Sequence, residues 1–249
     1  MSNRTLIQKI EQLSMNALPA LETKQRDGWI LRFANGYTKR ANSIHPLYRS
    51  SEEVEVKMKA CEQLYHDREL HVVYKITPTA SPSHLDDYLD SMGYTYEGET
   101  SVQVLLLDDM GEKPEAHVVM NDQLNDKWLD HYCHFNRVSI ADQLTLKNML
   151  EKIVPQTCYM LLTDEKGNVC SCGLGVLEGE YIGLFDIVTN EQVRKQGYGT
   201  KLIKSLLHWG KKHGACYAYL QVVLENVPAL KLYSKLGFKE VYMYWYRVK

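Results

Sequence analysis

Residues 193–202, VRKQGYGTKL, contain two glycines one residue apart and two basic residues just before them. The apolar pattern that follows is typical of a helix, and the first N–H groups of a helix have no partner within it. Together with the helix dipole they bind phosphate, and glycine lets the anion approach the backbone. Arg194 and Lys195 would add positive charge. These residues predict either a pyrophosphate site at Gly197 and Gly199 or a tight turn without a ligand.

The glycine spacing differs from that of two common nucleotide-binding loops. It matches neither the GxxxxGK[ST] pattern of the Walker loop nor the GxGxxG pattern of dinucleotide-binding domains. The stretch also lies late in the chain, not after a first strand. Nucleotide hydrolysis and hydride transfer are therefore disfavoured.

The elements around the glycine stretch alternate between strands and helices. Apolar segments with period-two alternation, separated by turn residues, indicate strands, and stripes at helical spacing indicate helices. In the second half we expect helices at 122–138 and 140–153, strands at 157–164, 169–179 and 181–189, a helix at 200–214, a strand at 216–223, a helix at 227–237 and a strand at 239–248.

The first half shows a similar order of elements. Asn35-Gly36 predicts a hairpin within 27–42, because both central residues of such a turn need positive φ. The later elements expected are a helix at 50–66, a strand at 70–77, a helix at 81–94 and a strand at 101–107. A shift of 144 positions lays 85–98 over 229–242, with Gly93 on Gly237. We therefore predict two related domains, joined within a polar stretch that carries Gly and Pro.

Composition points to a local site, not to a charged surface. The 249 residues are 45% hydrophobic and 24% charged, enough for one large core or two of ordinary size. A net charge of -2 gives no general attraction to nucleic acid or to acidic membranes. No signal-peptide core or run of about 20 apolar residues is present, and the six cysteines lack CxxC spacing. We expect a cytoplasmic protein without nucleic-acid or membrane partners.

Two motifs in the second half resemble signatures of the Gcn5-related N-acetyltransferases. VRKQGYGTKL is similar to that family's acyl-CoA loop, Arg/Gln-x-x-Gly-x-Gly/Ala. Residues 226–238, NVPALKLYSKLGF, are similar to its second signature, Asn-x-x-Ala-x-x-Leu-Tyr-x-x-x-Gly-Phe. The resemblance covers about 116–249, and the first half is similar to a weaker copy. There the loop counterpart has no glycine, and Pro82 and Leu89 stand where the second half has Asn226 and Tyr233.

The resemblance implies roles for particular positions in acetyl-CoA binding. Backbone amides of the glycine stretch would hold the pyrophosphate, and the end of the preceding strand would pair with the pantetheine arm. That strand would splay from the one at 216–223 and leave a V-shaped gap for the thioester. The residues expected at acetyl-CoA are Ile187, Val188, Thr189, Arg194, Lys195, Gln196, Gly197, Tyr198, Gly199, Thr200 and Asn226.

The chemistry also requires a proton acceptor and a proton donor, because a free amine attacks the thioester directly. The resemblance implies that Tyr233 protonates the leaving thiolate, although the same residue on an apolar helix face suits a core tyrosine. Asp186 is the candidate general base, or else it points at a structural partner; Glu180, Glu225 and a water relay compete with it. Asn226 suits a helix N-cap as well as a cofactor contact.

We therefore expect an α/β protein of two such domains, each a mixed, mostly antiparallel sheet flanked by helices. The expected boundaries are 1–108 for a degenerate domain without a CoA site, 109–115 for the linker and 116–249 for the catalytic domain. The expected activity transfers an acetyl group from acetyl-CoA to a primary amine of a small molecule, peptide or protein, without a metal. A non-catalytic acyl-CoA-binding regulatory module is the alternative.

Overall fold

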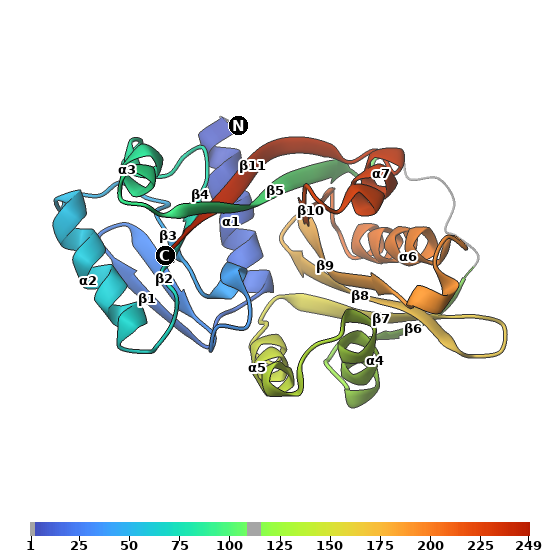
Figure 1. The fold of residues 1–249 in the computed structure, drawn as a ribbon. Helices are drawn as coiled ribbons and strands as arrows, with labels where there is room; N and C mark the ends of the chain where they lie inside the picture. Colours follow the sequence, from blue (N-terminus) through green and yellow to red (C-terminus); the bar gives the residue numbers. More distant parts are fainter. Residues whose placement is uncertain (1–2, 109–115) are drawn as a thin grey trace. The chain divides into compact units, whose positions relative to one another are not determined.

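The computed structural model describes residues 3–108 and 116–249, which form two compact units (Figure 1). The first unit comprises Met1–Val102, Gln221–Val227 and Glu240–Lys249, and the second comprises Gln103–Leu220 and Pro228–Lys239. The expected linker, 109–115, lies outside the described residues. The expected boundaries at 108 and 116 follow the internal repeat and not these units, because the last strand of the chain pairs within the first unit.

The first unit contains a mixed sheet with helices packed on it. Its elements are α1 (Asn3–Ala17), β1 (Glu22–Arg26), β2 (Trp29–Phe33), the 3-10 helix η1 (Lys39–Ala41), β3 (Ile44–His45), α2 (Val54–His66), β4 (Val73–Ile76) and α3 (Leu85–Ser91). Its strand order is β1-β2-β3-β4-β11, in which only β3 and β4 are parallel. An apolar core that includes Trp29, Tyr65 and Leu85 joins the strands to α2 and α3.

The second unit holds the glycine stretch. Its elements are β6 (His117–Asn121), α4 (Asp126–Asn136), α5 (Ile140–Leu150), β7 (Gln156–Thr163), β8 (Val169–Glu178), β9 (Tyr181–Thr189), the 3-10 helix η2 (Glu191–Val193), α6 (Tyr198–Lys212) and α7 (Val227–Lys235). Three strands contribute residues to both units: β5 (Thr95–Leu106), β10 (Tyr217–Val223) and β11 (Lys239–Val248).

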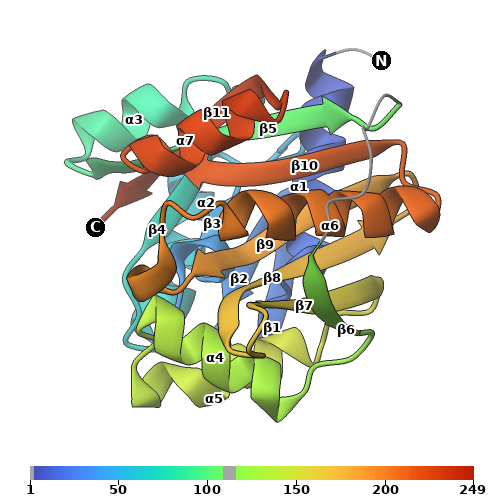
Figure 2. The ribbon, with the colours of Figure 1, turned by 90° about the vertical axis from the view of Figure 1, so that its right-hand side faces the viewer.

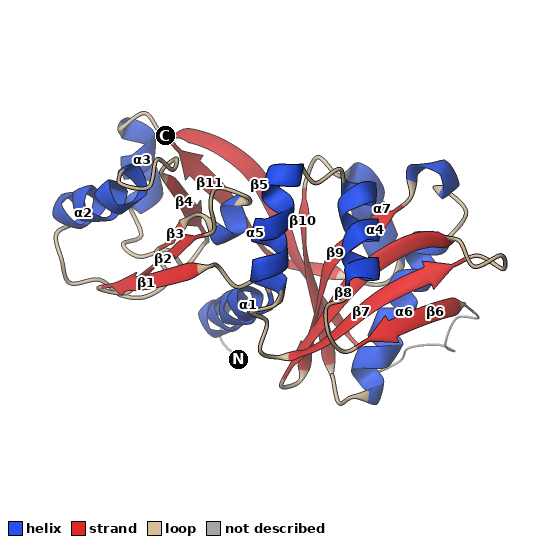
Figure 3. Ribbon diagram, turned by 90° about the horizontal axis from the view of Figure 1, so that it is seen from below, coloured by secondary structure: helices blue, strands red, loops and turns tan. Residues whose placement is uncertain are grey.

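The sheet of the second unit runs β10-β9-β8-β7-β6, with β9 and β10 parallel and the others antiparallel. Helix α6 lies along β8 and β9 on one face (Figure 2). Helices α4 and α5 cover the other face, seen from below in Figure 3. The predicted mixed α/β fold is thus confirmed. No helix in the described part of the chain is both long and apolar enough to cross a membrane.

The element positions agree with the internal repeat. Helices α2 and α6 begin at Val54 and Tyr198, which are 144 positions apart. The same separation holds between the first residues of β5 and β11, Thr95 and Lys239. The shift that the sequence suggested therefore matches secondary structure as well as residue type.

The hairpin predicted at Asn35-Gly36 is wrong. Both residues have the expected positive φ, 51° and 77°. However, the Asn42 side chain accepts hydrogen bonds from the N–H groups of Ala34 and Gly36 and holds the turn, which continues into η1 and not into a strand. The two-residue hairpin lies between β1 and β2, at Asp27-Gly28.

Candidate active site

Helix α6 begins after a glycine, which has no side chain to cap the backbone N–H groups of the first turn. Gly197, the residue before the helix, is left-handed (φ 85°) and makes no side-chain capping hydrogen bond. By contrast, the side chains of Asn125 and Ser139 cap α4 and α5. An uncapped first turn presents its amides and the positive end of the helix dipole to an anion. The structure therefore fits the predicted pyrophosphate position.

The two glycines serve this position in different ways. A Cβ built on Gly197 has no heavy atom within 4 Å, so the space beside it is open. A Cβ built on Gly199 would lie 3.3 Å from Thr189 Oγ1 and 3.7 Å from Leu232 Cδ2. The end of β9, the first turn of α6 and α7 therefore meet at Gly199. This meeting point brings the two sequence motifs together.

The loop between β9 and α6 folds back on the end of β9. The Arg194 Nε donates a hydrogen bond to the carbonyl oxygen of Thr189 at 3.4 Å. The Arg194 guanidinium also lies 3.7 Å from the Glu191 carboxylate. Lys195 has a positive φ of 64°, and Gln196 is exposed beside it. Arg194 thus shapes the loop as much as it adds charge.

Strand β9 has few pairs with β10. In the described chain the two strands share three residue pairs, of which the last joins Gly183 to Tyr219. Strand β9 nevertheless continues to Thr189, and its pairing with β8 reaches Ser171 opposite Thr189. The stretch 184–189, which includes Ile187 and Val188, is the part of β9 to which an extended arm could add main-chain hydrogen bonds.

Tyr233 lies on α7, with 9% of its surface exposed. Its ring meets that of Phe238 edge-on, with centroids 5.8 Å apart. Burial raises the pKa of the Tyr233 hydroxyl to about 12, so the group is protonated at neutral pH. Its neighbour Leu232 approaches Gly199, which places α7 beside the glycine loop. The position suits a proton donor, and the burial also suits a core tyrosine.

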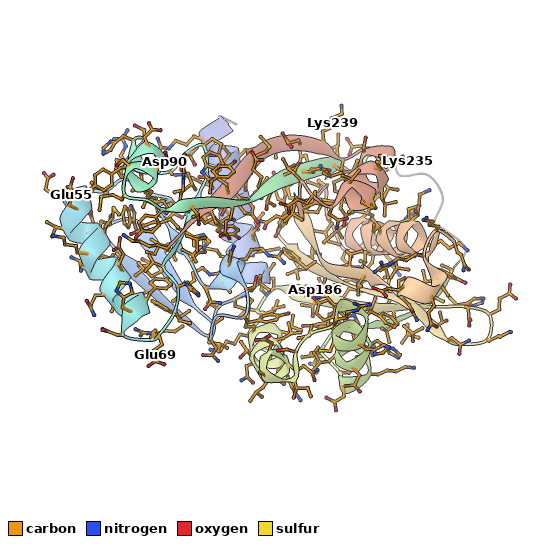
Figure 4. The ribbon with its side chains drawn as sticks, viewed as in Figure 1. Glu55, Glu69, Asp90, Asp186, Lys235 and Lys239 are labelled. Carbon is orange, nitrogen blue, oxygen red and sulfur yellow. The ribbon has the colours of Figure 1, made fainter. Side chains whose placement is uncertain are left out.

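Asp186 lies on β9, beyond the residues paired with β10, and has a left-handed φ of 52°. Figure 4 labels the Asp186 side chain. The Tyr132 hydroxyl of α4 donates a hydrogen bond to Asp186 Oδ1 at 3.0 Å. The structural partner that strand parity suggested is therefore present. Of the competing carboxylates, Glu180 precedes β9 at the end where β9 and β10 are paired, and Glu225 belongs to the first unit.

Asn226 stands directly before α7, within a segment that belongs to the first unit. Trp128 and Tyr132 were not among the predicted site residues, although their spacing of four residues on one helix indicates a shared face. Among the described residues, no group of three His, Cys, Asp or Glu side chains is placed to hold a metal ion.

In the first unit a side chain binds the loop that leads into the matching helix. Helix α2 begins 144 positions before α6. There the Asp27 carboxylate accepts hydrogen bonds from the N–H groups of Ser51 and Glu52, both at 2.9 Å, and from the Ser50 hydroxyl at 2.7 Å. The buried ammonium of Lys57 lies 3.1 Å from Asp27 Oδ2. An internal carboxylate thus binds N–H groups of the loop before α2, whose counterparts 144 positions later are those of Lys195 and Gln196.

We expect Asp27→Asn to lower the melting temperature at pH 7 and to lower it less at pH 3. Hydrogen bonds, first from the Glu52 N–H, hold the pKa of the Asp27 carboxyl far below its usual range. The resulting stability is complete above the unfolded-state pKa, about 4, and is lost as the pH falls toward the lower folded-state pKa. Circular dichroism melts measure this, with Asp67→Asn at the other end of α2 as the charge control. Equal losses at both pH values would contradict the assignment.

Comparisons with known proteins agree with this geometry. A family model described as "Probable histone acetyltransferase Rv0428c C-terminal" matches residues 5–247. The chain is similar to the uncharacterized N-acetyltransferase YobR of Bacillus subtilis (strain 168), with 30% identity over 249 residues and 98% coverage of each chain.

Two solved structures share the fold over most of their length. A GCN5-related N-acetyltransferase from Kribbella flavida superposes with a TM-score of 0.72 at 12% identity, covering 97% of this chain and 95% of that one. A tandem GNAT protein from the clavulanic acid biosynthesis pathway superposes with a TM-score of 0.65 at 12% identity, covering 96% and 87%. At such identities the likeness concerns the fold alone.

Proposed function

This chain belongs to the Rv0428c C-terminal family of Gcn5-related N-acetyltransferases, and from that premise we propose that its second half acetylates a primary amine. The proposed catalytic part is 116–249. The first half, 1–108, binds no acetyl-CoA in this proposal, because the Asp27 carboxylate already binds N–H groups of the loop before α2. The acceptor amine belongs to a small molecule, a peptide or a protein.

The observation that carries the proposal is the uncapped, glycine-lined start of α6, where β9 and α7 converge. Backbone amides of Arg194 to Thr200 hold the CoA pyrophosphate, because they have no side-chain cap to displace. The end of β9, from Ile187 to Thr189, binds the pantetheine arm along its edge. Asn226, at the start of α7, contacts the same arm.

Two side chains act as proton acceptor and proton donor in the proposed reaction. The acceptor nitrogen forms a bond to the acetyl carbonyl carbon, and the bond from that carbon to sulfur breaks. Asp186 takes the proton that the nitrogen loses, directly or through a water molecule. Tyr233 donates its proton to the departing thiolate, which its raised pKa allows because the hydroxyl stays protonated at neutral pH.

The test is thiol release from acetyl-CoA, measured against amines that include small metabolites, free amino acids and peptides with a free N-terminus. We expect release only when an acceptor is present, with one acetylated amine per thiol by mass spectrometry. Acetyl-CoA binding without release for every amine would favour the regulatory module instead. Absence of binding by calorimetry would overturn the site itself.

A further inference from the structure

The strand that carries Asp186 is bulged at that residue. Cys172 of β8 pairs with Val188 of β9 and Leu174 pairs with Phe185, so that Asp186 and Ile187 together face Gly173. Two residues opposite one define a β-bulge, which redirects a side chain. The left-handed φ of Asp186 belongs to this bulge and is costly for a residue with a Cβ. Surrounding contacts must therefore hold it.

Helix α4 contacts both strands at the bulge through two stacked rings. The Trp128 Nε1 donates a buried hydrogen bond to the carbonyl oxygen of Gly173 on β8 at 3.2 Å. One turn later, the Tyr132 hydroxyl donates to Asp186 Oδ1 on β9 at 3.0 Å. The two rings stack with centroids 5.2 Å apart and planes 7° apart. Each residue thus holds one strand, and stacking links them.

The Tyr132 hydroxyl is also oriented from its own helix. The Asn136 side chain donates a hydrogen bond to the Tyr132 oxygen at 3.1 Å. With its oxygen accepting from Asn136, the hydroxyl directs its single proton at Asp186. Donation into the oxygen strengthens the hydrogen bond that the hydroxyl gives.

The titratable groups around Asp186 come from three elements. They are Tyr132 and Cys133 of α4, Tyr159 of β7 and Cys172 of β8. Burial raises the pKa of Cys133, Tyr159 and Cys172, so all three are neutral at pH 7.

We infer that Tyr132 is a positioning residue for the acetyl transfer, which fixes the Asp186 carboxylate in the bulge through its Oδ1 atom. The inference rests on the proposed role of Asp186 as general base. Trp128 assists by fixing the facing strand. Removal of the Tyr132 hydroxyl withdraws a hydrogen bond from the charged carboxylate and so favours the protonated form.

The test is the pH profile of kcat/KM for Tyr132→Phe, measured with the best amine of the panel. The acid limb is the fall of kcat/KM toward low pH. We expect it to move up by about one pH unit, so that kcat/KM well below its midpoint falls about tenfold. The Kd for acetyl-CoA should stay unchanged in calorimetry, because the hydroxyl acts on Asp186 and not on the backbone amides of the glycine loop. Tyr217→Phe, which removes a hydroxyl from a stacked tyrosine on β10, is the matched control and should leave both unchanged.

Two further variants distinguish a failure of the base assignment from a failure of the positioning role. Asp186→Asn should lower kcat/KM at pH 7 by about 100-fold; an unchanged kcat/KM means that the base assignment fails and the inference with it. If Asp186→Asn lowers kcat/KM and Tyr132→Phe leaves the midpoint of the acid limb in place, the positioning role alone is overturned. Asn136→Ala alters an exposed residue and tests the same hydrogen bond without changing the buried ring. It should move the limb in the same direction by a smaller amount, and no movement would count against the inference.

Discussion

Gly197→Asp is expected to weaken acetyl-CoA binding at least about 100-fold, which corresponds to about 3 kcal/mol. The new side chain enters the open space beside the first turn of α6 and places a negative charge where the pyrophosphate binds. It also introduces a carboxylate at the N-cap position, where it can accept hydrogen bonds from the first N–H groups of the helix. Titration calorimetry with acetyl-CoA measures the loss directly.

The chain supplies a matched control for this variant. Gly167, in the turn between β7 and β8, has a φ of +83°, close to the +85° of Gly197, and a Cβ built on it also meets nothing within 4 Å. Gly167→Asp therefore carries the same backbone strain, about 1 kcal/mol, without a charge at the loop. We expect similar melting temperatures for the two variants and normal binding for Gly167→Asp. Full binding by Gly197→Asp would refute the pyrophosphate assignment.

Tyr233→Phe is expected to lower kcat by about 100-fold to 1,000-fold, because the departing thiolate loses its proton donor. The Kd for acetyl-CoA should change little, since the phenyl ring keeps the edge-on contact with Phe238. Because burial raises the pKa of Tyr233 to about 12, the wild-type rate should not fall with Tyr233 ionisation below about pH 10. Stopped-flow thiol release at several pH values, alongside calorimetry, measures all three effects.

A second tyrosine, on β10, provides the control for this variant. Tyr217→Phe removes a hydroxyl from a tyrosine stacked on Tyr181, at the end of β9 where it pairs with β10, and should keep kcat. An unchanged kcat in Tyr233→Phe would show instead that Tyr233 acts only in the core. Asp186 would then remain testable by itself through its own variant.

The sequence predicted the elements best where local patterns are strong. The final strand was expected at 239–248 and β11 spans those residues, and α6 begins within two residues of its expected start. Periodicity sufficed because each segment buries one continuous face. It failed at β6, whose five residues are too short for the pattern to stand out. It also failed at Asn35-Gly36, where an asparagine side chain from outside the turn decides how the chain continues after it.

The sequence likewise predicted some residues of the candidate site and not others. Gly197 and Gly199 were predicted from the spacing within one short motif, because an anion site is built from consecutive backbone groups. Tyr233 was predicted from the resemblance to the family's second signature. The partners of Asp186 were not, since Tyr132 and Trp128 meet the bulge only when α4 packs across β8 and β9. The sequence also did not predict that Asp27 binds the loop before α2, because this residue belongs to a separate hairpin.

The sequence by itself determined the family, the mixed α/β class and the place of the glycine loop, because these depend on local order and spacing. Tertiary structure alone decided which groups are in contact. Leu232 lies beside Gly199, Tyr132 binds Asp186, and Asp27 binds the loop before α2. It also decided that the last strand belongs to the first unit, where β11 pairs with β4. The physical reason is that strand pairing and side-chain packing join residues far apart in the chain, and no local pattern encodes such partners.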